Sequence, residues 1–400
     1  MNKIKSFLNW VITSNKKRWI SELAVFSCIA FLTCFFSLTH LTKLNAASTS
    51  TLLGIYYGDA DLNSIANINA METWQGKKHA IVHVFANWCD SPANFDGFFD
   101  QQLVNIWNNQ SVPMISWEPV LCHPSCNPTD EEVRTATPSD IEIRTVNGEF
   151  DIYLSKWADR MQVFLSGPDG VYNTADDRRA YIRFAHEMNG AWYPWAPTLG
   201  SGGNPASDYI NMWQRVRNIF SYRGMGSTHL QWIWSINSNP SLAYPPEQLY
   251  PGDNYVDWVG ISGYNWGTSQ TWSSWETPEQ TFGVTLSRLR ALTTKPIAIT
   301  EVATTGDTTT GTSVAAKSQG IIDFLKYALD RDIKMVVWFN DAKETDWKVF
   351  GGFSGDSQFD YSNKRYNAFS GYKASVGSSI FVPSNPANPR LLTDAQFAGL

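Results

Sequence analysis

The chain lacks the clusters of lysine and arginine that a nucleic-acid partner requires. Its net charge is −6, and no basic cluster follows the first twenty of its 400 residues. Because a phosphate-binding face needs grouped cations, we exclude nucleic acid as a partner. The sequence also has no low-complexity tract, no block of like charges, no internal repeat and no visible second domain. With 43% hydrophobic and 17% charged residues, the composition is that of a globular protein with a large core.

Cysteine is scarce, with five residues, two of which lie in an apolar N-terminal run. Cys122 and Cys126, in C-H-P-S-C, are close enough to form a small-loop disulfide outside the cytoplasm. His123 lies between them, but a C-x3-C pair without a second pair is a weak signal for a metal site. Cys89 is left over, and we predict that it is either buried or reactive.

The N-terminal segment carries an export signal. Its apolar run, Leu23–Leu41, is about nineteen residues long, enough to cross a bilayer as one helix. The basic residues before it are Lys3, Lys5, Lys16, Lys17 and Arg18. Residues 44–47 offer small side chains for cleavage, so residues 1–47 are predicted to be either a single-helix membrane anchor or a signal peptide. Both alternatives place the remainder of the chain outside the cytoplasm, secreted or membrane-anchored.

Aromatic residues are abundant, at 14% of the chain, and include 18 tryptophans. Tryptophan is rarely buried completely, so many of these indoles should be at least partly exposed. Flat rings stack on the apolar face of a pyranose, and this composition therefore indicates a carbohydrate or another flat ligand.

From residue 51 onward, short apolar runs alternate with stretches of helical period. Eight runs are predicted strands: Leu52–Tyr57, Ala80–Phe85, Pro113–Trp117, Tyr181–Ala185, Leu230–Ile236, Val256–Ser262, Pro296–Thr300 and Lys334–Phe339. Several are almost continuously hydrophobic, which is typical of parallel strands covered on both faces. Between them, apolar residues recur at helical spacing, as at Ile210, Trp213, Val216 and Phe220.

This alternation predicts an α/β fold, a (β/α)8 TIM barrel, as one catalytic domain over residues 48–378. A doubly wound open sheet is the alternative, but no glycine-rich phosphate fingerprint follows the first strand. Residues 379–400 form a proline-rich tail, predicted to be a surface strap or a disordered end.

The stretch from Tyr181 to Pro197 carries the strongest chemical signal. A strand ends there in a polar turn, and His186 and Glu187 lie at that end beside several aromatic residues. A carboxyl group bordered by indole faces suits a site that cleaves sugars. The alternative is an ordinary strand end with a surface glutamate.

A second carboxylate completes the predicted site. In a barrel the C-terminal strand ends share one mouth; Glu187 follows the fourth strand and Glu301 the seventh, on opposite sides. Retaining glycoside hydrolysis needs two carboxyl groups about 5–5.5 Å apart. We therefore predict that Glu187 is the acid/base and Glu301 the nucleophile, whereas a solvated cap or an ion-pair partner is the alternative for either residue.

The motif R-F-A-H-E-M-N-G-A-W-Y-P-W, with P-I-A-I-T-E downstream, resembles glycoside hydrolase family 26, the family of β-mannanases, over roughly residues 51–372. The resemblance implies the same two catalytic residues, Glu187 and Glu301. It also implies that Tyr264 hydrogen-bonds the nucleophile, that Trp338 forms the floor under the sugar, and that Arg183 supports the site from below.

The remaining predicted substrate contacts are His186, Trp192, Trp195, Trp117 and Trp266. The chain has W-Y-P-W where mannanases of the family tend to have W-F-W-W, and it resembles members that cut mixed-linkage β-glucan or xylan. The expected activity is that of a monomeric, retaining endo-β-glycanase acting on mannan-type β-1,4-linked or mixed-linkage polysaccharide. A carbohydrate-binding or transglycosylating cell-surface protein on the same barrel is the alternative.

No cofactor is expected, although one loop could hold a structural Ca2+. The loop of residues 167–177 offers Asp169, Asn173, Asp176 and Asp177 but lacks EF-hand spacing, so a capped turn is the alternative. His83, within an apolar strand, is predicted to be buried in the barrel. Trp266, Trp272 and Trp275 either extend the sugar cleft or pack as a loop cluster.

Overall fold

The computed structural model describes residues 50–58, 65–89, 92–121, 137–197, 204–240 and 244–400. The predicted N-terminal anchor or signal segment and the C-H-P-S-C pair lie outside these residues. Among the described residues, no helix has the length and apolar character needed to cross a membrane. Cys89 is disulfide-bonded, so the prediction that it is the left-over cysteine is wrong.

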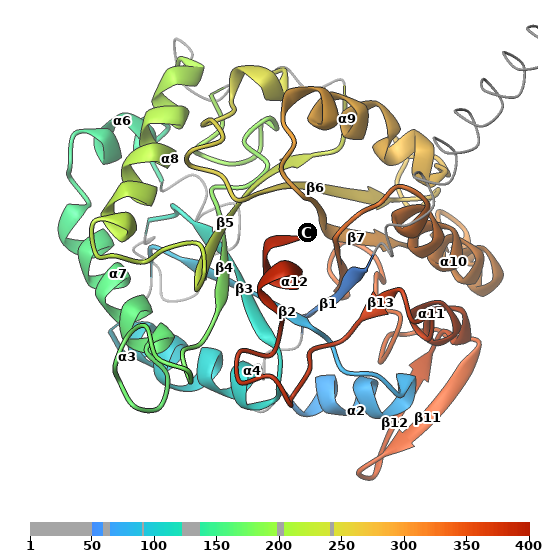
Figure 1. The fold of residues 1–400 in the computed structure, drawn as a ribbon. Coiled ribbons are helices and arrows are strands. Elements are labelled where there is room, and N and C mark those ends of the chain that lie inside the picture. Colours follow the sequence, from blue (N-terminus) through green and yellow to red (C-terminus); the bar gives the residue numbers. More distant parts are fainter. Residues whose placement is uncertain (1–49, 59–64, 90–91, 122–136, 198–203, 241–243) are drawn as a thin grey trace, which may run out of the picture. The chain divides into compact units, whose positions relative to one another are not determined.

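Eight parallel strands close into a barrel, as predicted (Figure 1). Each strand pairs with the next in chain order, and β10 pairs with β1, where Met335 is in register with Leu52. This pairing leaves no free sheet edge, so the open-sheet alternative is wrong. The barrel strands are β1 (Thr51–Tyr57), β2 (Ile81–Asn87), β3 (Val112–Glu118), β4 (Ala180–Phe184), β5 (Leu230–Asn237), β6 (Trp258–Asn265), β7 (Ile297–Thr304) and β10 (Met335–Asn340).

Helices surround the barrel in Figure 1. They are α2 (Ala66–Gln75), α3 (Pro92–Gly97), the π-helical turn η1 (Phe98–Leu103), α4 (Val104–Asn108), α6 (Ile141–Val146), α7 (Asp151–Leu165), α8 (Ala206–Ser221), the 3-10 turn η2 (Pro246–Gln248), α9 (Pro278–Leu292), α10 (Val314–Asp330) and α11 (Ser370–Val376). Their faces follow the sequence pattern: α8 buries Met212, Trp213, Val216 and Phe220 at helical spacing. The start of α9 is fixed by a capping box between Thr277 and Gln280.

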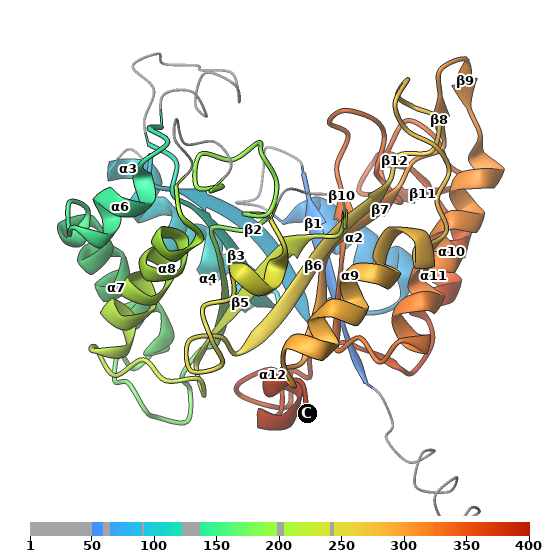
Figure 2. The same ribbon diagram turned by 90° about the horizontal axis from the view of Figure 1, so that it is seen from above.

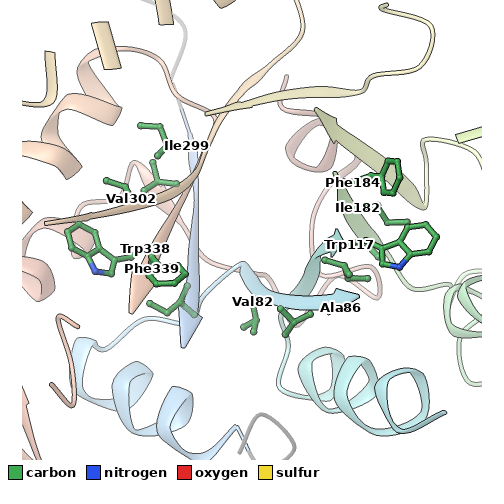
Figure 3. Close-up of a cluster of buried hydrophobic side chains, with 14 of the residues drawn as sticks. Val82, Ala86, Trp117, Ile182, Phe184, Ile299, Val302, Trp338 and Phe339 are labelled. Carbon is green, nitrogen blue, oxygen red and sulfur yellow. The ribbon is translucent and has the colours of Figure 1, made fainter. Parts of the chain in front are cut away.

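The strands bury side chains on both faces, and this gives two apolar layers. Leu52, Val112 and Val337 belong to the inner cluster, a small group of buried side chains from the barrel strands and the C-terminal segment. Their neighbours in sequence, such as Leu53, belong to the outer layer, a larger cluster that the strands share with the surrounding helices. Figure 3 shows part of this outer layer, with Trp117, Ile182 and Phe184 on one side of the barrel and Val302 and Trp338 on the other.

The C-terminal tail is ordered, and the prediction of a surface strap or a disordered end is wrong. It forms β13 (Phe381–Val382), which pairs with β1, and α12 (Asp394–Ala398). Leu391, Leu392 and Phe397 are buried in the inner cluster, and the Tyr181 hydroxyl donates to the Phe397 carbonyl at 2.9 Å. The tail therefore closes one end of the barrel and belongs to the same domain.

Two hairpins complete the fold: β8 (Asp307–Thr308) with β9 (Gly311–Thr312), and β11 (Ser357–Tyr361) with β12 (Lys364–Ala368). Figure 2 shows α12 at one end of the barrel and the β8–β9 hairpin, which follows β7, at the other. The C-termini of the barrel strands, with the loops that follow them, therefore lie at the end opposite α12, which is where catalytic residues occur in barrels of this kind.

Candidate active site

The end of β4 is a strained turn. Ala185 and Glu187 have φ values of 43° and 52°, which non-glycine residues seldom adopt. Both are held by neighbouring strands: the Ala185 amide donates to the Trp117 carbonyl at 3.0 Å, and the Glu187 amide to the Ser235 carbonyl at 2.8 Å. Such strain persists only where the surroundings impose it, and it is concentrated at functional sites. The turn fixes where the Glu187 side chain begins.

The Glu187 carboxyl group is buried, with 6% of the residue exposed. It accepts hydrogen bonds from Trp192 Nε1 at 3.0 Å and Asn237 Nδ2 at 3.2 Å. Burial and the negative charge of Glu301 raise the pKa of Glu187 to about 7. A carboxyl group with this pKa holds a proton close to neutral pH. Asn237, at the end of β5, was not among the predicted site residues, although its strand-end position was a usable signal.

Glu301 lies in β7, and two neighbouring side chains fix its carboxylate. Arg183 Nη1 and the Tyr264 hydroxyl each donate to one of its oxygens. Arg183 also donates to Ser116 Oγ at 2.9 Å and Ser262 Oγ at 2.6 Å, so side chains of strands β3, β6 and β7 hold its guanidinium. The predicted contact of Tyr264 and the supporting position of Arg183 are both present. Because Glu301 also acts on the pKa of Glu187, the fold brings the two predicted carboxylates together.

His186, between the two strained residues, is buried and neutral. Burial, followed by the positive charge of Arg183, lowers its pKa well below the usual value. Its Nε2 lies 3.1 Å from the Tyr193 hydroxyl and 3.9 Å from Glu118 Oε1. His186 therefore lies beside Glu187 as a hydrogen-bonding group without a charge of its own, and its contact with substrate stays a prediction.

Two predicted substrate contacts face away from the mouth, and those predictions are wrong. Trp117 is completely buried and stacks on Trp157 of α7, with ring centroids 4.1 Å apart. Trp338 packs edge-on against Tyr372 of α11 at 5.7 Å and cannot form a floor under a sugar. Side chains alternate along a strand, and both indoles fall on the outer face, between barrel and helices (Figure 3).

Trp195 is also wrongly predicted as a substrate contact, because it is completely buried. Its ring stacks on Tyr193 at 4.4 Å with an interplanar angle of 9°, and its Nε1 donates to the His186 carbonyl at 2.8 Å. Trp195 thus stabilises the loop from its buried side. Trp192 and Tyr193 are the partly exposed aromatics of this loop.

A second group of aromatics lies on the Glu301 side of the site. The Tyr264 ring is 5.2 Å from that of Trp347, which is buried and packs edge-on against Trp266 at 4.8 Å. Trp266 was predicted; Trp347, in the loop after β10, was missed because no periodic pattern marks it. Tyr56 and Phe339, stacked at 4.6 Å, were also missed, and Phe339 lies 5.6 Å from Tyr264.

The secondary predictions have clear outcomes. His83 is buried in the barrel, as predicted, with Nε2 2.7 Å from Ser116 Oγ. In the loop of residues 167–177, Asp176 and Asp177 accept hydrogen bonds from the amides of Asp169 and Asn173 at 3.1 and 2.7 Å, which fits the capped-turn alternative. Within the described ranges, no group of three or more His, Cys, Asp or Glu side chains is placed to hold a metal ion.

Comparison with known proteins points to one family. The profile of glycosyl hydrolase family 26 matches residues 169–278, which include the strained turn at Glu187. The chain is 29% identical over 372 residues to endoglucanase H of Acetivibrio thermocellus, covering 92% of this chain and 34% of that protein. It is 27% identical to a mannan endo-1,4-β-mannosidase of Bacillus subtilis, covering 57% of this chain and 61% of that protein. The chain thus spans about a third of the length of the first relative and about three fifths of the length of the second.

The fold agrees with this assignment. The catalytic domain of the family 26 endo-β-1,4-mannanase of Bacillus sp. JAMB-750 superposes with a TM-score of 0.58 at 16% identity, over 88% of this chain and 90% of that one. The motif resemblance drawn from the sequence is therefore confirmed. The chain is a member of glycoside hydrolase family 26.

Proposed function

We propose that this glycoside hydrolase is a retaining endo-β-glycanase that works by double displacement, with Glu187 as acid/base and Glu301 as nucleophile. The observation that carries the proposal is the contrast between the two buried carboxyl groups. Burial and the charge of Glu301 raise the pKa of Glu187 to about 7, whereas Glu301 is ion-paired with Arg183. One group can therefore carry a proton while the other carries a negative charge, which is the division that this reaction requires.

In the first step, protonated Glu187 donates its proton to the glycosidic oxygen, and the bond from that oxygen to the anomeric carbon breaks. A Glu301 oxygen attacks the same carbon and forms a glycosyl-enzyme ester. In the second step, Glu187 takes a proton from water, the water oxygen bonds to the anomeric carbon, and Glu301 leaves. The configuration at that carbon is thereby retained.

The neighbouring side chains suit these roles. Arg183 and Tyr264 fix the orientation of the Glu301 carboxylate, which favours attack from one direction. Trp192 and Asn237 each hold one oxygen of Glu187, and these contacts orient it toward the leaving oxygen. Because His186 is neutral, it adds no second positive charge beside Arg183.

For the substrate, we propose mannan-type β-1,4-linked polysaccharide or mixed-linkage β-glucan. The relative that matches over 92% of the chain is named an endoglucanase, and the second is named a mannosidase. The test is the release of reducing ends by the purified full chain from mannan, glucomannan, mixed-linkage glucan and xylan, with the Glu301→Ala variant assayed beside it. Activity on mannan, glucomannan or mixed-linkage glucan that disappears in the variant supports the proposal. Activity on xylan alone, or no release from any polymer, contradicts it.

We also propose that the enzyme acts outside the cytoplasm, tethered by or cleaved from residues 1–47. The basic flank and apolar run support this, and so does Cys89, since stable disulfides form in oxidising compartments. Cell fractionation with N-terminal sequencing of the recovered protein tests it. Recovery of the full chain from the cytoplasm with Cys89 reduced would contradict it.

A further inference from the structure

A row of aromatic rings leads from the nucleophile to the protein surface. Tyr264, which hydrogen-bonds Glu301, contacts Trp347, and Trp347 contacts Trp266. Trp266 in turn lies 5.2 Å from Trp272, ring centroid to ring centroid. Exposure increases from Trp347 outward: Trp347 is 1% exposed, Trp266 is half-buried and Trp272 is 69% exposed. Each ring packs on the next, so the outermost indole is continuous with the reaction centre.

The loop that carries Trp266 and Trp272, between β6 and α9, is held in place at several points. Asn265 Oδ1 accepts hydrogen bonds at 3.1 Å from the amides of both Gly267 and Glu276, which brings the two ends of the loop together. Thr268 bridges to Thr308 of the β8–β9 hairpin, and its carbonyl accepts from the Thr309 amide at 2.9 Å. The loop is therefore preorganised, and little conformational entropy would be lost when a ligand binds it.

Gly267 gives this loop its close packing. Its φ is 52°, and a Cβ placed there would lie 3.1 Å from the Trp275 indole. Trp275 therefore covers the backbone at the base of the loop, whereas Trp272 projects from it. Trp272 is 69% exposed on a fixed loop and packs on the half-buried Trp266, so the two indoles together present apolar surface to solvent.

We propose that Trp266 and Trp272 form a sugar-binding subsite for a unit of the polysaccharide that lies outside the cleaved bond. The inference rests on the proposed function, because it takes a β-linked sugar chain as the ligand. Flat indole faces bind the apolar face of a pyranose, and the aromatic row places this surface in continuity with the catalytic carboxylates. The subsite makes the enzyme prefer long chains: binding energy from a remote sugar unit contributes to catalysis at the cleaved bond.

The test measures kcat/KM against chain length. Reducing-end-labelled β-linked oligosaccharides of two to six units, from the polymer that the enzyme cleaves, are given to the full chain and to Trp272→Ala. In the wild type, kcat/KM should rise at the length that fills the subsite. In Trp272→Ala that rise should fall by about tenfold, while the shortest cleaved oligosaccharide is hydrolysed at the wild-type rate. Trp272→Phe, which keeps a flat ring, should restore most of the difference.

The matched control is Tyr222→Ala. Tyr222 is 85% exposed, but it follows α8 and lies at the end of the barrel opposite the strand C-termini. The dependence of kcat/KM on oligosaccharide length in Tyr222→Ala should therefore equal that of the wild type. If Trp272→Ala has the wild-type length dependence while Glu301→Ala is inactive, the subsite is refuted and the proposed function stands. If the wild type cleaves no β-linked oligosaccharide, both proposals fail. An equal loss at every length would also refute the subsite.

Discussion

The guanidinium of Arg183 and the carboxylate of Glu301 form an ion pair inside the barrel, with side-chain exposures of 0% and 6%. Two serine hydroxyls, on Ser116 and Ser262, accept the remaining hydrogen bonds from the Nη atoms of Arg183. A buried pair of this kind is costly to desolvate, and the removal of one partner leaves the other charge uncompensated. The arrangement therefore ties the stability of the fold to the position of Glu301.

The first prediction concerns this pair. Arg183→Met should lower the free energy of unfolding by about 3–5 kcal/mol, because it leaves the Glu301 carboxylate buried without a counter-charge. Urea unfolding measures the loss. The control is Arg365→Met, which breaks the exposed Arg365–Asp360 pair and should change the free energy of unfolding far less, because water screens that pair. Equal effects of the two substitutions would refute the role given to Arg183.

The second prediction concerns the nucleophile. Glu301→Ala should abolish hydrolysis with the fold intact, because no carboxylate remains to form the ester. Added azide should restore some turnover and give a glycosyl azide of inverted configuration, since it attacks the anomeric carbon directly. Product configuration is measured by NMR. Undiminished hydrolysis in the variant would rule out Glu301 as the nucleophile.

The third prediction concerns the proton donor. Since Glu187 must be protonated to act as the acid, kcat/KM should fall as the pH rises through about 7, the value to which burial and Glu301 raise its pKa. In Glu187→Gln this limb should be absent. The variant should also hydrolyse substrates with poor leaving groups far more slowly than activated aryl glycosides. Equal losses on both substrate types would show that Glu187 is not the acid.

The fourth prediction concerns a carboxyl group away from the site. Burial, aided by the nearby Asp208, raises the pKa of Glu142 in α6 to about 7. The folded-state pKa lies above the unfolded value, so the protonated form contributes stability that is complete below about pH 4.5 and is lost as the pH rises through about 7.

Glu142→Gln should abolish this loss and raise the free energy of unfolding at pH 8 by on the order of 2–3 kcal/mol, with activity unchanged. The introduced amide keeps an oxygen for the hydrogen bond that Asn204 donates to Glu142 at 3.2 Å. Urea unfolding at pH 5 and pH 8 measures the effect. Glu149→Gln, at an exposed position, is the control and should leave the pH dependence of unfolding close to that of the wild type. An unchanged pH slope in Glu142→Gln would contradict the assignment.

The fifth prediction concerns the C-terminal tail. Phe397 is 1% exposed in the inner cluster, so Phe397→Ala should cost about 3–5 kcal/mol of stability. Leu400→Ala is the control, because Leu400 is 85% exposed and should lose almost nothing. Thermal unfolding compares the two. If both variants melt with the wild type, the tail does not close the barrel in solution.

Local patterns were sufficient for much of the fold. The eight apolar runs marked the barrel strands to within a few residues, because a strand buried on both faces must be hydrophobic almost throughout. Once the strands were placed, the expectation that Glu187 and Glu301 lie close to strand C-termini followed, although β7 continues to Thr304 and Glu301 lies within it. Tyr264 and Arg183 came from the motif resemblance, and their contacts with Glu301 are present.

Because these strands are hydrophobic almost throughout, the sequence did not show which side chains point into the barrel and which point toward the helices. Trp117 and Trp338 stand one position away from Ser116 and Phe339, which contact the interior groups Arg183 and Tyr264. A shift of one residue moves a strand side chain to the opposite face. In a run that is apolar throughout, no alternation of polar and apolar residues distinguishes the two faces. The two tryptophans were therefore placed in the site although they pack against the outer helices.

The sequence by itself determined the succession of strands and helices, the closed parallel barrel and the two carboxylates at opposite strand ends, because these depend on local periodicity and chain order. Only the tertiary structure decided which tryptophans face the mouth, that Leu391, Leu392 and Phe397 enter the barrel, and that the pKa of Glu187 rises to about 7. These features arise from burial and charge among residues far apart in the chain, and no local pattern encodes such contacts.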